Sequence, residues 1–204
     1  MVILIGGSSS VGKTVAASEL ARRHGFRHLQ VDALRAAEPH PAVHFVGSSP
    51  EVWRLGPEIL RDRLIEMGAA LRPHILRLVV EQLASDVPTV IEGEGIEPSL
   101  LESLAGLTVR LVFLVEASET RLAETLANRP SDGARRFRQL RVEDRLCVTR
   151  MNRLYGEWIQ AEARRRRLPC LPSQPWHDLA DRVIDAATKD LQRSPGGRAD
   201  ISVR

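Results

Sequence analysis

Short, mostly apolar runs alternate along the chain with longer segments whose apolar residues recur at helical spacing. Runs of this kind, rich in β-branched residues, are typical of strands that are buried on both faces of a parallel sheet. They predict five strands, at residues 2–5, 28–31, 89–91, 109–115 and 168–171. Because strands alternate with helices, we expect a parallel sheet with right-handed crossover connections.

The segments between these runs predict the helices. Helical spacing extends over residues 15–23, 57–84, 118–127, 137–167 and 176–191. A short helix is also expected near Pro98, and a break in the second long segment near Gly68 or Pro73, because proline removes a helical hydrogen bond. No linker divides the chain, so we expect one domain over residues 1–193. The proline- and glycine-containing residues 194–204 are predicted to form a flexible tail.

The connection between the first strand and the first helix fits the pattern G-x-x-x-x-G-K-[ST], a phosphate-binding loop. Its residues are Gly7, Ser8, Ser9, Ser10, Val11, Gly12, Lys13 and Thr14. The two glycines permit positive φ angles and a close approach of the backbone to phosphates. Successive N–H groups and the N-terminus of the next helix offer donors and positive partial charge to an anion. The octet therefore predicts a nucleotide-binding site, and a serine-rich turn before an ordinary helix is the alternative.

Lys13 is one of only two lysines in the 204 residues, so it does not belong to a lysine-rich surface. In a loop of this kind the lysine bridges the β- and γ-phosphates, and the hydroxyl of the next residue ligates Mg²⁺. We therefore predict a catalytic role for Lys13 and a metal-binding role for Thr14.

Charged residues follow the second predicted strand, at the edge of the sheet where open α/β proteins bind ligands. Asp32 is predicted to act as a general base, or to anchor the hydroxyl group of a phosphoryl acceptor. Arg35, three residues later, is placed to bind an anionic group of the same substrate. An N-cap of a short helix is the alternative role for Asp32, and the two roles are compatible.

Glu92 follows the third predicted strand, where phosphate-loop enzymes place an acidic residue near the metal. We predict that it holds a water bound to Mg²⁺ or positions the substrate. Glu94 is a rival for the same task. A strand-end carboxylate that faces solvent is the alternative.

A turn-rich, arginine-dense segment at about residues 128–145 predicts a lid. Lids of phosphoryl-transfer enzymes bring guanidinium groups onto the transferred phosphoryl group and exclude water. The candidates are Arg129, Arg135, Arg136, Arg138, Arg141 and Arg145. Arg129 and Arg136 are predicted to act in catalysis. For any single arginine, a solvated position at a basic helix start is the alternative.

Composition narrows the classes of ligand and the cellular locations that remain possible. The chain has a net charge of +3, 43% hydrophobic residues and 4% aromatic residues, and its aromatic residues do not interleave with the basic runs. Nucleic-acid binding is therefore not expected, because single-stranded sites need aromatic stacking platforms. No apolar run approaches the length of a membrane span. Cys147 and Cys170 lack metal-ligand spacing, which favours free thiols and a cytoplasmic location. A monomer or a homodimer is expected.

The octet, together with residues 31–35 (VDALR) and 90–93 (VIEG), resembles the phosphate-loop small-molecule kinases of the nucleoside- and shikimate-kinase-like superfamily. Within it, Pro98, residues 53–57 and the region around Tyr155 are most similar to 2-phosphoglycerate-kinase-like proteins. The resemblance implies a three-layer α/β/α P-loop NTPase fold with a five-stranded parallel sheet and a short helical lid. It also implies ATP and Mg²⁺ as cofactors, and an adenine site bordered by residues 172–176.

The resemblance implies an ATP- and Mg²⁺-dependent phosphotransferase that acts on a hydroxyl group of a small, anionic metabolite. A nucleoside or nucleotide kinase is one alternative, and a regulatory ATPase without an acceptor is another. The chain lacks the Asn-Lys-x-Asp motif of guanine-nucleotide switches and the Ser-Gly-Gly motif of transporter ATPases. Residues 38–53, rich in histidine and proline, are expected to line the acceptor site, so the acceptor itself stays open.

Overall fold

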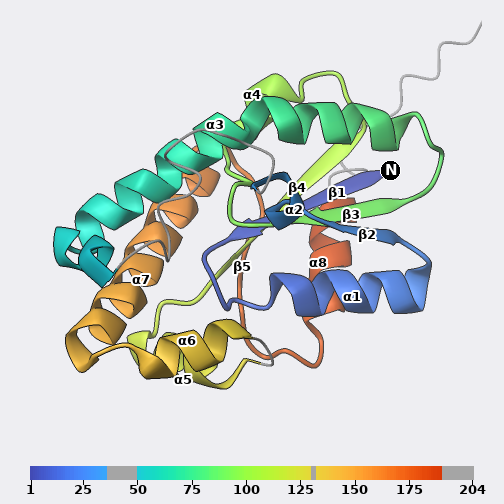
Figure 1. Cartoon of the computed structure of the whole chain (residues 1–204). Coiled ribbons are helices and arrows are strands. Elements are labelled where there is room, and N and C mark those ends of the chain that lie inside the picture. Colours follow the sequence, from blue (N-terminus) through green and yellow to red (C-terminus); the bar gives the residue numbers. More distant parts are fainter. Residues whose placement is uncertain (36–49, 130–131, 190–204) are drawn as a thin grey trace, which may run out of the picture.

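A computed structural model describes residues 1–35, 50–129 and 132–189, and shows a parallel five-stranded sheet. The strands are β1 (Val2–Gly7), β2 (Arg27–Gln30), β3 (Thr89–Glu92), β4 (Val109–Val115) and β5 (Cys170–Pro172). They lie in the order β2-β3-β1-β4-β5, with β1 at the centre (Figure 1). The predicted fold class is confirmed. The predicted tail at 194–204 and most of the segment at 38–53 lie outside the described residues.

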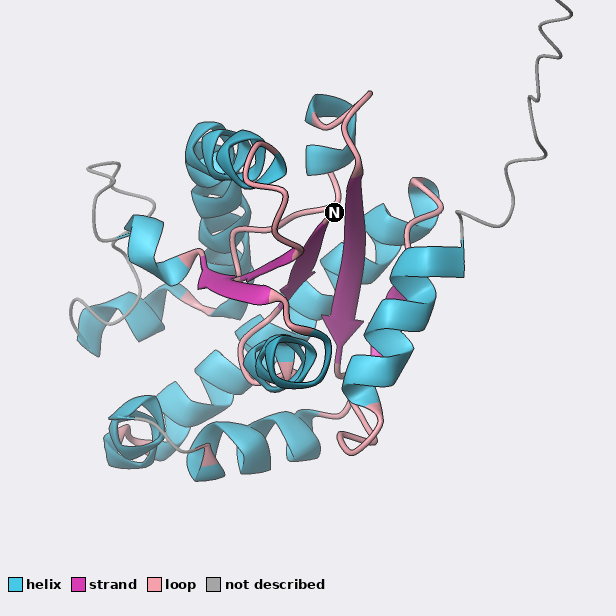
Figure 2. Ribbon diagram, turned by 90° about the vertical axis from the view of Figure 1, so that its right-hand side faces the viewer, coloured by secondary structure: helices cyan, strands magenta, loops and turns pink. Residues whose placement is uncertain are grey.

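The helices cover both faces of this sheet (Figure 2). They are α1 (Lys13–His24), α2 (Asp32–Arg35), the 3-10 helix η2 (Pro50–Leu55), α3 (Pro57–Leu83), α4 (Leu100–Ser103), α5 (Glu119–Asn128), α6 (Asp132–Gln139), α7 (Val142–Arg165) and α8 (Leu179–Thr188). In the part of the chain that the structure describes, no helix has the length and apolar character of a membrane span.

Alternation along β1 divides the core into two layers. Val2 and Leu4 pack with residues of α3 and α7 on one face, whereas Ile3 and Ile5 pack with α1 and α8 on the other. All four side chains are fully buried, as expected for the central strand of a parallel sheet. This packing holds the carboxyl ends of β1, β2 and β3 at one edge.

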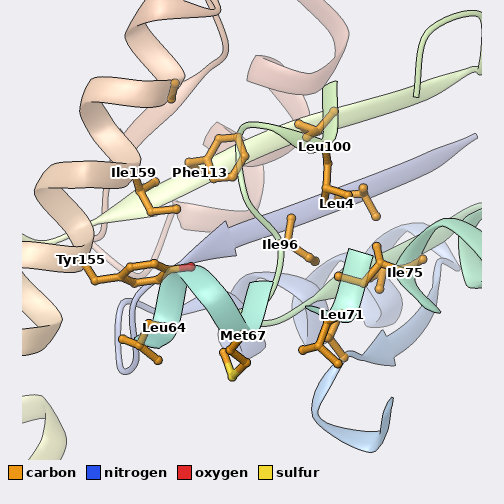
Figure 3. Close-up of a cluster of buried hydrophobic side chains, with 14 of the residues drawn as sticks. Leu4, Leu64, Met67, Leu71, Ile75, Ile96, Leu100, Phe113, Tyr155 and Ile159 are labelled. Carbon is orange, nitrogen blue, oxygen red and sulfur yellow. The ribbon is translucent and has the colours of Figure 1, made fainter. Parts of the chain in front are cut away.

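Helix α3 continues through both positions where a break was predicted, so that prediction is wrong. Pro73 lies inside the helix, where the adjacent Leu71 and Ile75 are fully buried. Burial of this apolar face outweighs the loss of one helical hydrogen bond. Figure 3 shows Leu64, Met67, Leu71 and Ile75 along α3, with Leu4 and Ile96 beside them.

The long helix predicted at 137–167 is divided into α6 and α7. Arg141 is extended (φ −61°, ψ 161°), and its guanidinium group pairs with the buried carboxylate of Asp144 at 2.9 Å. This ion pair stabilises the N-terminus of α7, so α6 is a separate helix within the predicted lid. Strand β5 also begins later than predicted, because the N–H of Leu168 bonds to the carbonyl of Ala163 and closes the end of α7.

Glu97 is a buried carboxyl group between β3 and α4, with only 2% of its surface exposed. Its Oε1 atom has no hydrogen-bond partner among the described residues. It lies so close to α3 that a side chain on Gly68 would place Cβ 2.1 Å from that oxygen. Burial raises the pKa of Glu97 to about 8, and the positive charge of Arg72 and the hydroxyl of Ser99 offset this only in part.

Glu97 should make the protein less stable as the pH rises. Between its ordinary pKa of 4.5 and about 8, the folded state keeps a proton that the unfolded state has lost. The free energy of unfolding should therefore fall by up to about 1.4 kcal/mol per pH unit in that window and level off above it. Urea denaturation at several pH values measures this slope. A Glu97→Gln variant should lose this part of the slope, and an unchanged slope in that variant would contradict the assignment.

Candidate active site

The phosphate loop turns sharply between β1 and α1 because of its two glycines. Gly7 and Gly12 have φ angles of 140° and 91°. A Cβ on Gly7 would lie 2.2 Å from the carbonyl oxygen of Leu114, and one on Gly12 would lie 2.8 Å from Cδ2 of Leu179. Larger residues would therefore push the loop away from the sheet and from α8. The loop conformation predicted from the sequence requires glycine at both positions.

The side chain of Lys13 folds back over the phosphate loop. Its ammonium group donates to the carbonyl oxygens of Gly7 at 3.1 Å and Ser8 at 2.6 Å. The side chain is buried, so the loop carbonyls supply the polar contacts that water would otherwise make. The first N–H groups of α1 lie beside it and have no partners within the helix. The ammonium group and these N–H groups together place positive charge and hydrogen-bond donors at one point of the loop.

Several buried polar atoms at the loop have no hydrogen-bond partner. Among the described residues, they include the hydroxyl oxygens of Ser8 and Ser10 and the Nε atom of Arg129. Buried polar groups are nearly always satisfied in folded proteins, so unsatisfied ones that gather at one place indicate a missing ligand. An anion with several oxygen atoms, such as a polyphosphate, fits these donors.

Thr14 and Glu92 form the acidic side of the site. The Thr14 hydroxyl donates to Oε1 of Glu92 at 2.8 Å, and Nε2 of His28 lies 3.6 Å from the same oxygen. Burial acts to raise the pKa of Glu92, but the neighbouring His28 ring, the charge of Lys13 and the Thr14 hydroxyl outweigh it, so this pKa lies below its ordinary value. The carboxylate therefore stays ionised at neutral pH. A hydroxyl beside a carboxylate suits a hard cation such as Mg²⁺.

Asp32 lies at the same edge because the pairing of β2 with β3 continues past the strands. The N–H of Val31 donates to the carbonyl of Glu92 at 2.9 Å, and Asp32 then begins α2. Its carboxylate is exposed and faces the cavity beside the loop. Glu94 lines the same cavity. The side chain of Arg35 lies outside the described part of the structure, so its predicted role stays a prediction.

The lid arginines divide into two groups. Arg129 and Arg136 line the cavity, and Nη1 of Arg129 donates to the Ser9 hydroxyl at 3.0 Å. Three others make contacts within the lid region. Arg141 pairs with Asp144, Arg138 donates to the carbonyl of Ala127, and Arg145 donates to the carbonyl of Arg138. Arg135 is exposed. Of the two arginines predicted to be catalytic, Arg129 therefore contacts the loop, and Arg136 lines the cavity beside it.

Two cavities meet at the phosphate loop. One, of about 710 Å³, extends over α3, α6 and α7, and the other, of about 670 Å³, extends over α5 and Trp176. Six residues line both: Ser10, Lys13, Thr14, Asp32, Arg129 and Gly133. Five of these six belong to the octet or to the residues predicted to be catalytic. The site therefore has two compartments with one shared junction.

Sequence reasoning missed Asn152 and Gly133. Oδ1 of Asn152 accepts the backbone N–H of Ser9 at 2.9 Å, although 143 residues separate the two positions. A Cβ on Gly133 would lie 2.0 Å from Nη2 of Arg129. Both residues therefore help to position the loop and its arginine. No local pattern marks Asn152, because its partner is supplied by packing of α7, whereas Gly133 lies inside the predicted lid.

The two cysteines are free. Sγ of Cys147 donates to the carbonyl of Trp53 at 3.3 Å, and burial raises the pKa of this thiol. Burial also raises the pKa of Cys170, to about 11. Both thiols therefore stay protonated at neutral pH, which favours packing over a nucleophilic role.

Two solved structures are similar to this one over nearly their full lengths. A gluconokinase from Sinorhizobium meliloti 1021 matches with a TM-score of 0.51 and 21% identity, over 95% of this chain and 97% of the other. This chain shares its fold. A shikimate kinase from Acinetobacter baumannii, in complex with shikimate, matches with a TM-score of 0.50 and 15% identity, over 96% and 95%. No family model and no curated protein sequence matches the chain. The finer resemblance to 2-phosphoglycerate-kinase-like proteins stays a prediction.

Gly133→Ala should separate stability from ligand binding. Gly133 is the second residue of helix α6 and has no positive φ angle, so alanine suits its backbone and the melting temperature should not fall. The new methyl group must displace the Arg129 guanidinium from Ser9, so the affinity for ATP, used as a polyphosphate probe, should fall by about 10-fold or more. Thermal melting and calorimetric titration with ATP measure the two effects. Affinity at the parent's level would show that the Arg129 position does not matter.

Proposed function

We propose that the protein is an ATP- and Mg²⁺-dependent phosphotransferase that acts on a hydroxyl group of a small molecule. The observation that carries this proposal is the junction of two cavities at Lys13, Thr14, Asp32 and Arg129. A kinase needs a donor site and an acceptor site that meet where the phosphoryl group is transferred. A regulatory ATPase without an acceptor has no need of the second compartment.

The cavity over α5 is suited to the nucleotide. It begins at the N-terminus of α1 and reaches Thr125, Asn128 and Trp176. Trp176 lies within the segment that the resemblance placed beside adenine, and an aromatic ring there offers a stacking surface for a base. The polyphosphate would then lie along the loop, with its terminal group near Lys13 and Arg129. This orientation aims the donor at the second cavity.

Residues of the junction supply the chemistry. Asp32 accepts the proton of the acceptor hydroxyl as its oxygen attacks the γ-phosphorus of ATP, and the bond between that phosphorus and the bridging oxygen breaks, so that ADP leaves. Lys13 and Arg129 neutralise the charge that spreads over the transferred phosphoryl oxygens. Mg²⁺, when bound, adds further charge neutralisation. Thr14 and Glu92 would hold it, directly or through water, since their oxygens lie together beside Lys13.

The names of the two similar structures support this choice without fixing the acceptor. One is a gluconokinase, and the other is a shikimate kinase with shikimate bound. Both names denote kinases of small hydroxylated molecules. A screen of ATP turnover with alcohols, sugar acids, nucleosides and aminoglycosides tests the proposal. If no acceptor raised ADP release above background, the regulatory ATPase would be favoured instead.

Lys13→Ala should weaken the binding of ATP–Mg²⁺ by about 10-fold or more. A hydrogen bond to a charged group contributes about 1.5–3 kcal/mol, and the variant lacks the ammonium group of the loop. Isothermal titration calorimetry measures the change. Lys189→Ala is a matched control, because Lys189 is the other lysine of the chain and is exposed. Parental affinity in Lys13→Ala would refute the loop assignment.

Asp32→Asn should lower kcat by about 10²-fold or more while the affinity for ATP survives, since the amide cannot accept the hydroxyl proton. Steady-state kinetics with the best acceptor, together with ATP titration, separate the two effects. Asp185→Asn, a change on the exposed face of α8, removes the same charge away from the site and should leave both constants unchanged. Unchanged turnover in Asp32→Asn would remove Asp32 from the mechanism.

A further inference from the structure

Much of the wall of the cavity over α3, α6 and α7 is apolar, whereas its junction with the loop is polar and charged. Beyond the junction, its wall includes Trp53, Leu64, Phe137, Leu140, Val148 and Met151. These side chains come from η2, α3, α6, α7 and the connection between α6 and α7. Leu64, Phe137, Val148 and Met151 are each less than 9% exposed, so they are fixed by the core behind them. The wall is therefore a preformed apolar surface.

Two polar side chains behind this wall, Asn152 and Cys147, are engaged elsewhere. Asn152 is 1% exposed, its Oδ1 atom accepts from the N–H of Ser9, and its Nδ2 atom donates to the carbonyl of Val148. The sulfur atom of Cys147 contacts the carbonyl of Trp53 and ties η2 to α7. Neither interaction leaves a strong donor pointing from the wall toward a ligand. Substrate hydroxyl groups pressed against this wall would lose hydrogen bonds to water without replacement.

The charges of the cavity lie mostly at the end near the loop. Asp32, Glu92 and Glu94 supply negative charge there, and Lys13 and Arg129 supply the positive charge that the polyphosphate needs. Arg136, on the exposed face of α6, is the further cation of the described lining. A strongly anionic acceptor would meet the carboxylates of Asp32 and Glu94 beside the transfer point, since Glu92 would hold Mg²⁺. A neutral hydroxyl on an apolar body meets no such repulsion.

We propose that the acceptor is an alcohol carried on an aromatic or alicyclic body, and not a polyol or a sugar acid. This inference rests on the proposed function. The hydroxyl would reach Asp32 at the junction, and the apolar body would pack against Trp53, Phe137 and Met151. A volume of about 710 Å³ lies within the range of pockets that bind drug-sized ligands, which leaves room for a ring system.

A comparison of two acceptor classes tests the proposal. The apolar probes are 2-phenylethanol and 4-phenylcyclohexanol, and the polar probes are D-gluconate, D-glycerate and myo-inositol. With saturating ATP and Mg²⁺, kcat/KM should be at least about 10-fold higher for the better apolar probe than for any polar probe, because specificity follows differential burial of the acceptor. Product analysis by ³¹P NMR distinguishes a phosphate ester from phosphate released by hydrolysis.

A pair of variants tests whether the apolar wall is what discriminates between the two classes of acceptor. Met151→Gln keeps the length of the side chain and makes the wall polar, so kcat/KM for the apolar probe should fall by about 10-fold while KM for ATP is unchanged. Leu146→Gln is the matched control, since Leu146 lies on the same helix and is 64% exposed.

The outcomes separate this inference from the proposed function. Transfer to polyols or sugar acids with higher kcat/KM than to either apolar probe would overturn the apolar acceptor and leave the kinase proposal standing. Equal losses in Met151→Gln and Leu146→Gln would likewise overturn the role of the wall. Absence of transfer to every acceptor of both classes would overturn the proposed function, and this inference with it.

Discussion

Parallel pairing of β3 with its two neighbours is the constraint on which the site depends. The pairing continues past the last residue of the strand, since Val31 N–H donates to the Glu92 carbonyl and Gly93 N–H donates to the Ile5 carbonyl. These bonds fix the ends of three strands at one level. The phosphate loop, Asp32 and Glu92 then leave the sheet side by side. A shift of the register would separate the carboxylates from Lys13.

The loop itself keeps polar groups in a state that costs folding free energy. Lys13 is buried against carbonyl oxygens, and the Ser8 and Ser10 hydroxyl groups have no partner in the part of the chain that the structure describes. The apolar layers on both faces of β1 supply the stability that offsets this cost. Binding of a polyphosphate would satisfy these donors. The site is thus prepared for an anion before one arrives.

The two compartments follow from the two layers of helices. One cavity is lined by residues of α1, α5 and the segment before α8, whereas the second is lined by residues that include those of α3, α6 and α7. The separate helix α6 matters here, because it carries Gly133 to the junction and Arg136 to the wall of the second cavity. Asn152 links the two sides, since it belongs to the acceptor wall and holds the N–H of Ser9 in the loop.

The sequence alone was sufficient for the order and approximate positions of the strands, for the octet, and for the acidic residues at the ends of β2 and β3. These features are local, because a glycine turn, a helix start and an apolar run are each determined by neighbouring residues. The break predicted in α3 was wrong because local residues alone do not determine whether a helix continues. The local effect of Pro73 was visible in the sequence, but the buried contacts of Leu71 and Ile75 that outweigh it were not.

Only the tertiary structure decided which arginines face the loop and what the second cavity is made of. Arg129 and Arg138 look alike in the sequence, yet one bonds to Ser9 and the other to the carbonyl of Ala127. The apolar wall combines side chains from η2, α3, α6 and α7, and no local sequence pattern predicts that these side chains lie together. The sequence by itself determined the phosphate-binding loop, because such a loop is a backbone conformation. The chemistry of the second cavity depends on side chains from distant elements, which only their packing brings together.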